Sequence, residues 1–272
     1  MKKTIITLLV AFAAMTACAQ FYGVDINKLG PVLKQAQALP RDNAMIIVKS
    51  IMTATEKNPM AFRKTLEFVE IHLGNPADSL HNEDMYLAAL EHAAKSYVLS
   101  SSEKERPQLL LEMAKKNATG TKAADLEYVT PDGKTHRLSE ANGKLTLVYF
   151  NDPECDACQQ VKQNLDASSV KDLAKAGQLN VVAINPVNNE KKWKKAEFPA
   201  WMTNGWDKKQ QIENEEVYVM PVSLPVFYLL AADGTVLLKN EPSLKRIEAA
   251  LAKAVAAKDL PSADLVKLLF NK

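Results

Sequence analysis

The fold is decided by one stretch, Leu145-Thr-Leu-Val-Tyr-Phe-Asn-Asp-Pro-Glu-Cys-Asp-Ala-Cys158. Its first six residues are mostly apolar, β-branched or aromatic, as in a strand that is covered on both faces. Asn151-Asp-Pro153 ends that strand. After the second cysteine, Val161 and Leu165 are four residues apart, and this spacing favours a helix. The stretch therefore predicts two thiols at the start of a helix, beside the end of a buried strand.

The spacing of the two cysteines favours thiol–disulfide exchange. Two residues between Cys155 and Cys158 bring the sulfurs within bonding distance across one helical turn. The first sulfur would lie near unpaired backbone N–H groups and the positive end of the helix dipole, both of which favour a thiolate. We therefore expect Cys155 to be the exposed nucleophile. Cys158, partly covered one turn further in, would resolve the mixed disulfide, so that the two form a reversible disulfide.

Three carboxylates, Asp152, Glu154 and Asp156, lie close to Cys155 in the sequence. Negative charge disfavours a thiolate, so we expect the pKa of Cys155 to be lowered only modestly. A weakly stabilised thiolate accompanies a reducing potential. This predicts a potential of about −270 mV, as in thioredoxin, rather than about −120 mV, as in strong oxidants.

Two other roles for the cysteine pair fit the sequence less well. A zinc site needs further ligands, but the chain has no second cysteine pair, and its histidines form no close pair at ligand spacing. The histidines are His72, His81, His92 and His136. A purely structural disulfide that closes a two-residue loop would restrain little of the unfolded chain. We therefore favour a redox-active pair, with no metal and no cofactor.

The N-terminus has the pattern of an export signal. Lys2-Lys3 precedes an apolar segment, Thr4 to Met15, that is too short to span a bilayer as a mature helix. Ala17-Cys-Ala19 fits ordinary signal peptidase, so that residues 1–19 would be removed. Met15-Thr-Ala-Cys18 also resembles a lipobox, in which residues 1–17 would be removed and Cys18 lipidated. In either case we expect a periplasmic protein, soluble or lipid-anchored.

The composition indicates an ordinary globular protein. The 272 residues suffice for two modest domains, and 47% are hydrophobic and 24% charged. The formal net charge of +2 gives no indication of nucleic acid or of an anionic membrane as a partner. We find no further run that is long and apolar enough for a transmembrane helix.

Residues 21–118 are expected to form an all-helical domain, because helix caps and apolar stripes recur and no run alternates like a strand. Asn58-Pro59 predicts the clearest helix start. The other predicted helices are a short one from Ile26 interrupted by Gly30-Pro31, one capped by Asp42-Asn43, one from Glu83 to Leu99, and one from Pro107 to Asn117. This part shows no pattern of catalytic residues, and we expect it to recruit substrates or to mediate oligomerisation.

Residues 119–272 are expected to form an α/β domain. The order is a hairpin, the strand with the cysteine helix, a second buried strand, a helical connection, a second hairpin and a final helix. The ranges are 126–138 for the first hairpin, 180–185 for the second strand, 188–216 for the connection, 226–238 for the second hairpin and 243–255 for the helix. A strand–helix–strand unit of this length implies parallel pairing through a right-handed crossover. This is a thioredoxin-like sandwich with an added N-terminal β-hairpin.

The connection and the second hairpin add two features. Trp193, Trp201 and Trp206 all lie in the connection, and we expect them to be core residues under a loop rather than substrate contacts. The lysines around Trp193 are expected to form a solvated helix face. Leu224-Pro225 directly precedes a predicted strand, a position that suits either an ordinary strand-start proline or a turn with a cis bond.

Roughly residues 123 to 257 resemble a known family. The motifs that carry the resemblance are Ala124-Asp-Leu-Glu-Tyr, Pro131-Asp-Gly-Lys134, Asn142-Gly-Lys144, the strand with its two cysteines, and Leu224-Pro225. They resemble the TlpA/ResA-like thioredoxin group of extracytoplasmic thiol–disulfide oxidoreductases. The resemblance implies that Cys155 attacks, that Cys158 resolves, and that Leu224 and a cis Pro225 form the wall that faces the pair and the substrate. It also implies that a membrane thiol carrier returns the electrons.

The chain departs from that group beside the first cysteine. Glu154 stands where most members have tryptophan, and Asp156-Ala157 replaces a pair that contains proline. This pattern, together with the junction from Lys116 to Asp125, is closer to a subgroup with an N-terminal helical domain of unknown function. We therefore expect an exported oxidoreductase that reduces disulfides in protein substrates. The alternative is a redox-inactive thioredoxin-fold binding or scaffold protein. A peroxidase would need a Thr-rich loop before Cys155, and none is present.

Overall fold

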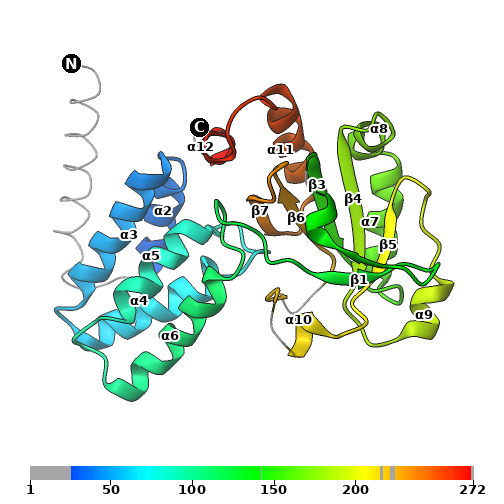
Figure 1. Cartoon of the computed structure of the whole chain (residues 1–272). Coiled ribbons are helices and arrows are strands. Elements are labelled where there is room, and N and C mark those ends of the chain that lie inside the picture. The colour runs from blue at the N-terminus through cyan, green and yellow to red at the C-terminus, as the bar shows by residue number, and fades with distance from the viewer. Residues whose placement is uncertain (1–25, 142, 215–216, 221–223, 271–272) are drawn as a thin grey trace. The chain divides into compact units, whose positions relative to one another are not determined.

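The computed structural model describes residues 26–141, 143–214, 217–220 and 224–270, which form two compact units (Figure 1). The second unit comprises Lys116–Leu269, and the first comprises the chain before it together with the end from Phe270. The predicted signal segment and Cys18 lie outside the described residues. No helix in the described ranges has the length and apolar character needed to cross a membrane.

The first unit is helical in its described part. The helices are α2 (Ile26–Ala36), α3 (Arg41–Thr55), α4 (Pro59–His72), α5 (Glu83–Ala93) and α6 (Ser101–Lys115). They enclose one apolar core, whose fully buried members include Leu33, Met52, Phe62, Leu73 and Met85. Asn58 caps α4 as predicted, because its side-chain oxygen accepts hydrogen bonds from the backbone N–H groups of Met60 and Ala61.

Two helices differ from the prediction at a proline, each for its own reason. α2 continues through Pro31, because Leu29 and Leu33 on its inner face are buried in the core and this packing outweighs the lost backbone hydrogen bond. α6 begins well before Pro107, because Ser100 and Glu103 form a capping box in which each side chain accepts from the other's backbone N–H.

Smaller differences concern α3 and α5. Pro40 rather than Asp42 or Asn43 occupies the cap position of α3, so these two residues lie in the first turn. α5 ends at Ala93 instead of reaching Leu99.

The second unit is built on a sheet of order β2-β1-β5-β4-β3-β6-β7 within the described residues. The strands are β1 (Glu127–Val129), β2 (Thr135–Arg137), β3 (Leu145–Phe150), β4 (Leu179–Asn185), β5 (Thr203–Trp206), β6 (Val226–Leu230) and β7 (Val236–Glu241). The helices are η1 (Leu138–Ala141), α7 (Asp156–Asp166), α8 (Ser169–Lys175), α9 (Glu190–Lys195), α10 (Gln211–Asn214), α11 (Leu244–Ala256) and α12 (Ser262–Phe270). Both predicted hairpins and the thioredoxin-like arrangement are confirmed.

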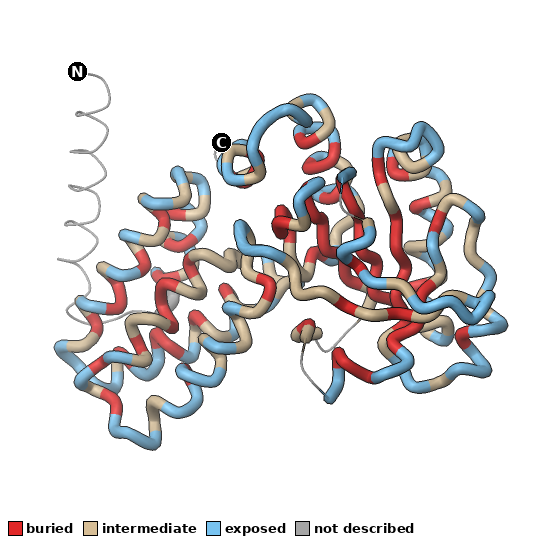
Figure 2. The backbone as a smooth tube through the Cα atoms, in the orientation of Figure 1, coloured by how far each residue is buried: buried red, intermediate tan, exposed pale blue. Residues whose placement is uncertain are grey.

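Strand β3 lies in the interior of the sheet, next to the middle strand β4. It pairs in parallel with β4 and antiparallel with β6, and all six of its residues are buried, as the continuous red trace in Figure 2 shows. Val148 and Phe150 belong to an apolar cluster on one face of the sheet. Successive strand residues point to opposite faces, so Leu147 and Tyr149 fill the other face. Coverage on both faces explains the continuous apolar sequence of this strand.

Strand β5 lies inside the connection that was predicted to be helical. It has only four residues, including Gly205, and is therefore too short and too irregular to be recognised from an alternating pattern. It pairs in parallel with β4, and Trp206 pairs with Val129 of β1. β5 thus joins the N-terminal hairpin to the rest of the sheet.

Gly205 should not tolerate a side chain. An added Cβ would lie 2.7 Å from Ile184 Cδ1 and from Tyr128 Cδ2. Gly205→Ala should therefore lower the free energy of unfolding by about 1–3 kcal/mol, as overpacking does. Urea unfolding followed by tryptophan fluorescence measures this change, because all three tryptophans lie in the second unit.

Gly30→Ala in α2 is the matched control. There the nearest atoms to an added Cβ lie at 3.7 and 3.9 Å, so alanine should fit and stabilise the helix by up to about 1 kcal/mol. Circular dichroism follows the unfolding of the Gly30→Ala protein. Equal stability of the Gly205→Ala and wild-type proteins would show that the contact between β5 and the hairpin is looser than described.

Candidate active site

The cysteine pair lies where β3 ends and α7 begins. Asn151, the first residue after β3, is buried, and its backbone N–H donates to the carbonyl of Ile184 at the end of β4. Cys155 is the N-cap residue of α7, and Cys158 lies in its first turn. The placement agrees with the expectation from the sequence, because the turn Asp152–Glu154 leads directly from the sheet to the helix.

A hydrogen bond connects the two cysteines. The backbone N–H of Cys158 donates to Sγ of Cys155, with an N–S distance of 3.2 Å. Cys155 is half-buried, whereas Cys158 is only 1% exposed, and both are free thiols in this structure. The accessible sulfur therefore occupies the position in which a helix start offers N–H groups to a negative charge.

The Cys158 thiol is held in its protonated form. Burial, as the largest cause, together with the neighbouring Cys155 and the charge of Asp152, raises the pKa of Cys158 to about 12. The backbone N–H of Asp152 lies 3.5 Å from the Cys158 sulfur and acts in the opposite direction. At neutral pH this group is therefore a thiol, and the two cysteines differ in exposure and in surroundings.

Leu224 and Pro225 lie next to the nucleophile. The Leu224–Pro225 peptide bond is cis, as the family resemblance implies. Sγ of Cys155 lies 3.6 Å from the carbonyl oxygen of Leu224, and both residues of the dipeptide are half-buried. The start of β6 and the start of α7 thus form adjacent sides of the thiol site.

The three flanking carboxylates have different surroundings. Oδ1 of Asp152 accepts from the backbone N–H of Glu154 at 2.9 Å, and its charge acts on Cys158. Glu154 forms an ion pair with Lys192 of α9. Asp156 is exposed in the first turn of α7. The negative charge beside Cys155 is therefore partly compensated.

Two residues at this site were not predicted from the sequence. The hydroxyl of Tyr149 donates to the carbonyl oxygen of Cys158 at 2.6 Å, and its ring stacks on Phe227 with centroids 5.1 Å apart. Burial, followed by the charges of the two cysteines, raises the pKa of Tyr149. Lys192 had been assigned to a solvated face, and only the fold brings it to Glu154. A buried tyrosine hydroxyl needs a partner, and that need was the available signal for Tyr149.

The tryptophans are packing residues. Trp193 and Trp206 are buried and stack with ring centroids 5.4 Å apart. Their indole N–H groups donate to Asn204 and to the carbonyl of Val187. Trp201 is half-buried and donates to Asp166. The expectation that they form core under the connection is confirmed for the two buried rings.

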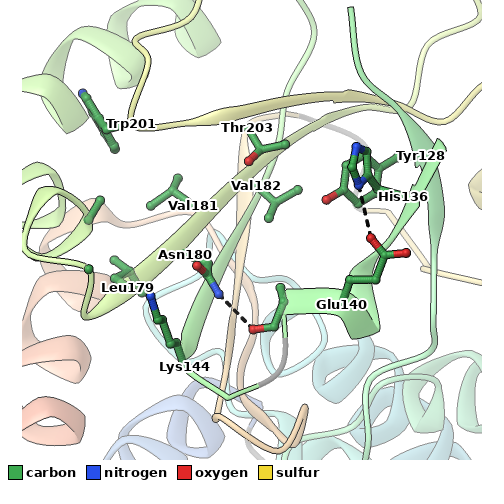
Figure 3. A pocket seen from close by; sticks show the side chains of 13 residues that line it. Tyr128, His136, Glu140, Lys144, Leu179, Asn180, Val181, Val182, Trp201 and Thr203 are labelled. Carbon is green, nitrogen blue, oxygen red and sulfur yellow. Dashed lines mark hydrogen bonds and ion pairs between the residues drawn. The ribbon is translucent and has the colours of Figure 1, made fainter. Parts of the chain in front are cut away.

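A separate pocket of about 370 Å³ lies at the opposite end of β4 (Figure 3). In it, His136 faces Glu140 at 3.1 Å, and Asn180 donates to the carbonyl of Ala141. Its lining also includes Tyr128, Lys144, Leu179, Trp201 and Thr203, and neither described cysteine. Among the residues that the structure describes, no group of three or more potential ligands could hold a metal ion.

Comparisons with known proteins agree with this architecture. Residues 28–117 match a family described as a domain of unknown function, DUF5106. The crystal structure of a thioredoxin-like protein from Bacteroides caccae has a TM-score of 0.79 and 30% sequence identity, and the match covers 86% of this chain and 85% of that one. None of the curated proteins matches the chain.

Two further crystal structures match about half of this chain. The C-terminal domain of an uncharacterised protein from Bacteroides fragilis is 35% identical over 50% of this chain and 99% of that chain, with a TM-score of 0.48. The thioredoxin domain of a thiol-disulfide oxidoreductase from Bacteroides vulgatus is 22% identical over 51% of this chain and 98% of that chain, with a TM-score of 0.45.

The raised pKa of Cys158 predicts its reactivity. In a Cys155→Ser variant, Cys158 should react with iodoacetamide at pH 8 at least about a hundredfold more slowly than an ordinary cysteine, because only the thiolate reacts. The rate should still increase at pH 10, since the pKa is about 12. Mass spectrometry of quenched samples measures both rates, with Cys155 in a Cys158→Ser variant as the exposed control. A rate for Cys158 that levels off near pH 9 would contradict the described burial.

Proposed function

Since the chain belongs to the thioredoxin-like family, we propose that it is an exported thiol–disulfide oxidoreductase that reduces disulfides in other proteins. The observation that carries this proposal is the hydrogen bond from the Cys158 N–H to Sγ of Cys155. It places an accessible sulfur at the start of a helix and a buried, protonated thiol one turn away. A nucleophile and a resolving group need that asymmetry.

In the proposed reaction, the thiolate of Cys155 attacks one sulfur of the substrate disulfide. The new S–S bond links Cys155 to the substrate, and the other substrate sulfur leaves as a thiolate that takes up a proton. Cys158 then loses its proton and attacks Sγ of Cys155. This step forms the Cys155–Cys158 disulfide and releases the second substrate thiol. Two electrons have then passed from the protein to the substrate.

The surrounding residues would have separate roles in this reaction. The carbonyl of Leu224, 3.6 Å from Sγ of Cys155, lies on the side where a bound peptide would approach, so Leu224 and Pro225 would contact the substrate backbone. The low exposure of Cys158 would keep its thiol from reacting with other disulfides before the mixed disulfide forms. Asp152, whose carboxylate acts on Cys158, would oppose early deprotonation.

The cellular setting is also a proposal. Removal of residues 1–19, or of residues 1–17 with lipidation of Cys18, would deliver residues 21–118 and 119–272 to the periplasm as a helical and a thioredoxin-like domain. A membrane thiol carrier would reduce the Cys155–Cys158 disulfide again, since each turnover consumes two electrons. The partners would then be a disulfide-containing protein substrate and this electron donor.

The first test is turnover. The full-length mature protein should reduce insulin disulfides with dithiothreitol as the electron source, and precipitation of the insulin B chain follows the reaction. Cys155→Ala should abolish the catalysed rate, because no other described thiol is accessible. Cys158→Ala should lose most of the catalysed rate, and its reduced form should stop at a mixed disulfide with insulin when dithiothreitol is left out. A wild-type rate no higher than that of Cys155→Ala would instead support the redox-inactive scaffold.

The second test is the reduction potential. Asp152, Glu154 and Asp156 disfavour a thiolate, and compensation of Glu154 by Lys192 is only partial because that ion pair is exposed. We expect a potential of about −270 mV, which redox equilibration with glutathione or dithiothreitol buffers measures. Lys192→Gln should make the potential more negative, and Lys191→Gln, one residue away on α9, is the matched control. A potential above roughly −180 mV would refute a reducing role.

A further inference from the structure

Helix α9 is fixed beside the thiol site by its buried face. Trp193 is 1% exposed, stacks on Trp206, and donates to Asn204 at 2.7 Å. The side chain of Asn189 caps the helix by accepting from the backbone N–H of Lys192. Lys192 in turn pairs with Glu154, the residue before Cys155. Six residues of helix are therefore held at a defined place next to the nucleophile.

The outer face of α9 is basic. Four of its six residues are lysines, and all four are exposed. Lys192 is neutralised by Glu154, and Lys194 by Glu190 at 2.9 Å. Lys191 and Lys195, one turn apart, have no ion-pair partner within the described ranges.

We propose that Lys191 and Lys195, here called the α9 lysine patch, bind an acidic segment of the protein whose disulfide reacts with Cys155. This inference rests on the proposed oxidoreductase function and adds the class of partner. The patch is small and the whole chain carries a formal charge of only +2, so an acidic peptide segment fits it better than a nucleic acid does.

The distribution of charge also indicates where the acidic segment would lie. Asp152 and Asp156 belong to the segment that carries Cys155, the unpaired lysines belong to α9, and the Glu154–Lys192 ion pair joins the two segments. Acidic residues directly beside the partner's cysteine would meet Asp156. Acidic residues a few positions further along the partner would reach the patch instead. The arrangement favours a partner whose negative charge is separated from its disulfide.

The effect should appear mainly in the rate of association. Complementary charges steer encounters and accelerate binding, and salt screens them beyond a Debye length of about 10 Å at 0.1 M. We expect the reduced protein to react about tenfold faster with an acidic than with a basic disulfide peptide at low ionic strength. High salt should remove most of this difference.

The test uses the reduced full-length protein and three disulfide peptides that differ only in three residues, Asp, Ser or Lys, placed a few positions from the cysteine. Stopped-flow tryptophan fluorescence gives the second-order rate constants. The expected order is Asp, then Ser, then Lys. Lys191→Gln/Lys195→Gln should bring the Asp and Lys rates together and leave the Ser rate unchanged. Charge reversal with Lys191→Glu/Lys195→Glu should invert the order.

The matched control is Lys144→Gln/Lys175→Gln. These exposed lysines lie near the amino ends of β3 and β4, at the opposite end of the parallel strands from Cys155, and removing them changes the net charge equally. If the Ser peptide is reduced normally and the Asp and Lys peptides react at the same rate as it does, the role of the α9 lysine patch is refuted. The proposed oxidoreductase function would still stand. The role of the patch is also refuted if Lys144→Gln/Lys175→Gln reduces the difference between the Asp and Lys rates as much as Lys191→Gln/Lys195→Gln does. That result would show an effect of net charge. Failure to reduce any peptide would instead refute the oxidoreductase function and this inference with it.

Discussion

The hydrogen bond from the backbone N–H of Cys158 to Sγ of Cys155 links the chemistry of this protein to its fold. It exists only because α7 begins at Asp156, immediately after the turn that follows β3. β3 in turn is fixed by β4 and β6 on its two sides and by apolar side chains on both faces. A strand that is buried along its whole length therefore determines where the reactive sulfur lies.

Burial gives the two thiols different properties although they are only three residues apart. Cys158 faces the interior, where desolvation stabilises the neutral thiol. The hydroxyl of Tyr149 in β3 donates a hydrogen bond to the carbonyl oxygen of Cys158. Cys155 faces the cis Leu224–Pro225 bond and the surface. Lys192 of helix α9 forms an ion pair with Glu154. The charge beside Cys155 therefore depends on two segments that are distant in the sequence.

The sequence was sufficient for the elements whose signals are local. Strand β3, the two hairpins and the Asn58 cap follow from apolar runs, turn residues and capping chemistry. β5 was missed because its four residues, with Gly205, are specified by pairing with β4 rather than by their own pattern. The passage of α2 through Pro31 was missed because core packing outweighs a proline, and the early start of α6 was missed because the Ser100–Glu103 capping box lies upstream of Pro107. The contacts of Glu154 with Lys192 and of Tyr149 with Cys158 depend on the completed fold and have no local signature.

The central claim is that Cys155 forms mixed disulfides with proteins and that Cys158 resolves them. Trapping with full-length Cys158→Ala in cells tests it most directly, with Cys155→Ala/Cys158→Ala as the control. Non-reducing electrophoresis and mass spectrometry should show other proteins joined to Cys155, released by dithiothreitol and absent from the double variant. A folded, exported Cys158→Ala protein that carries no such adduct would contradict the account.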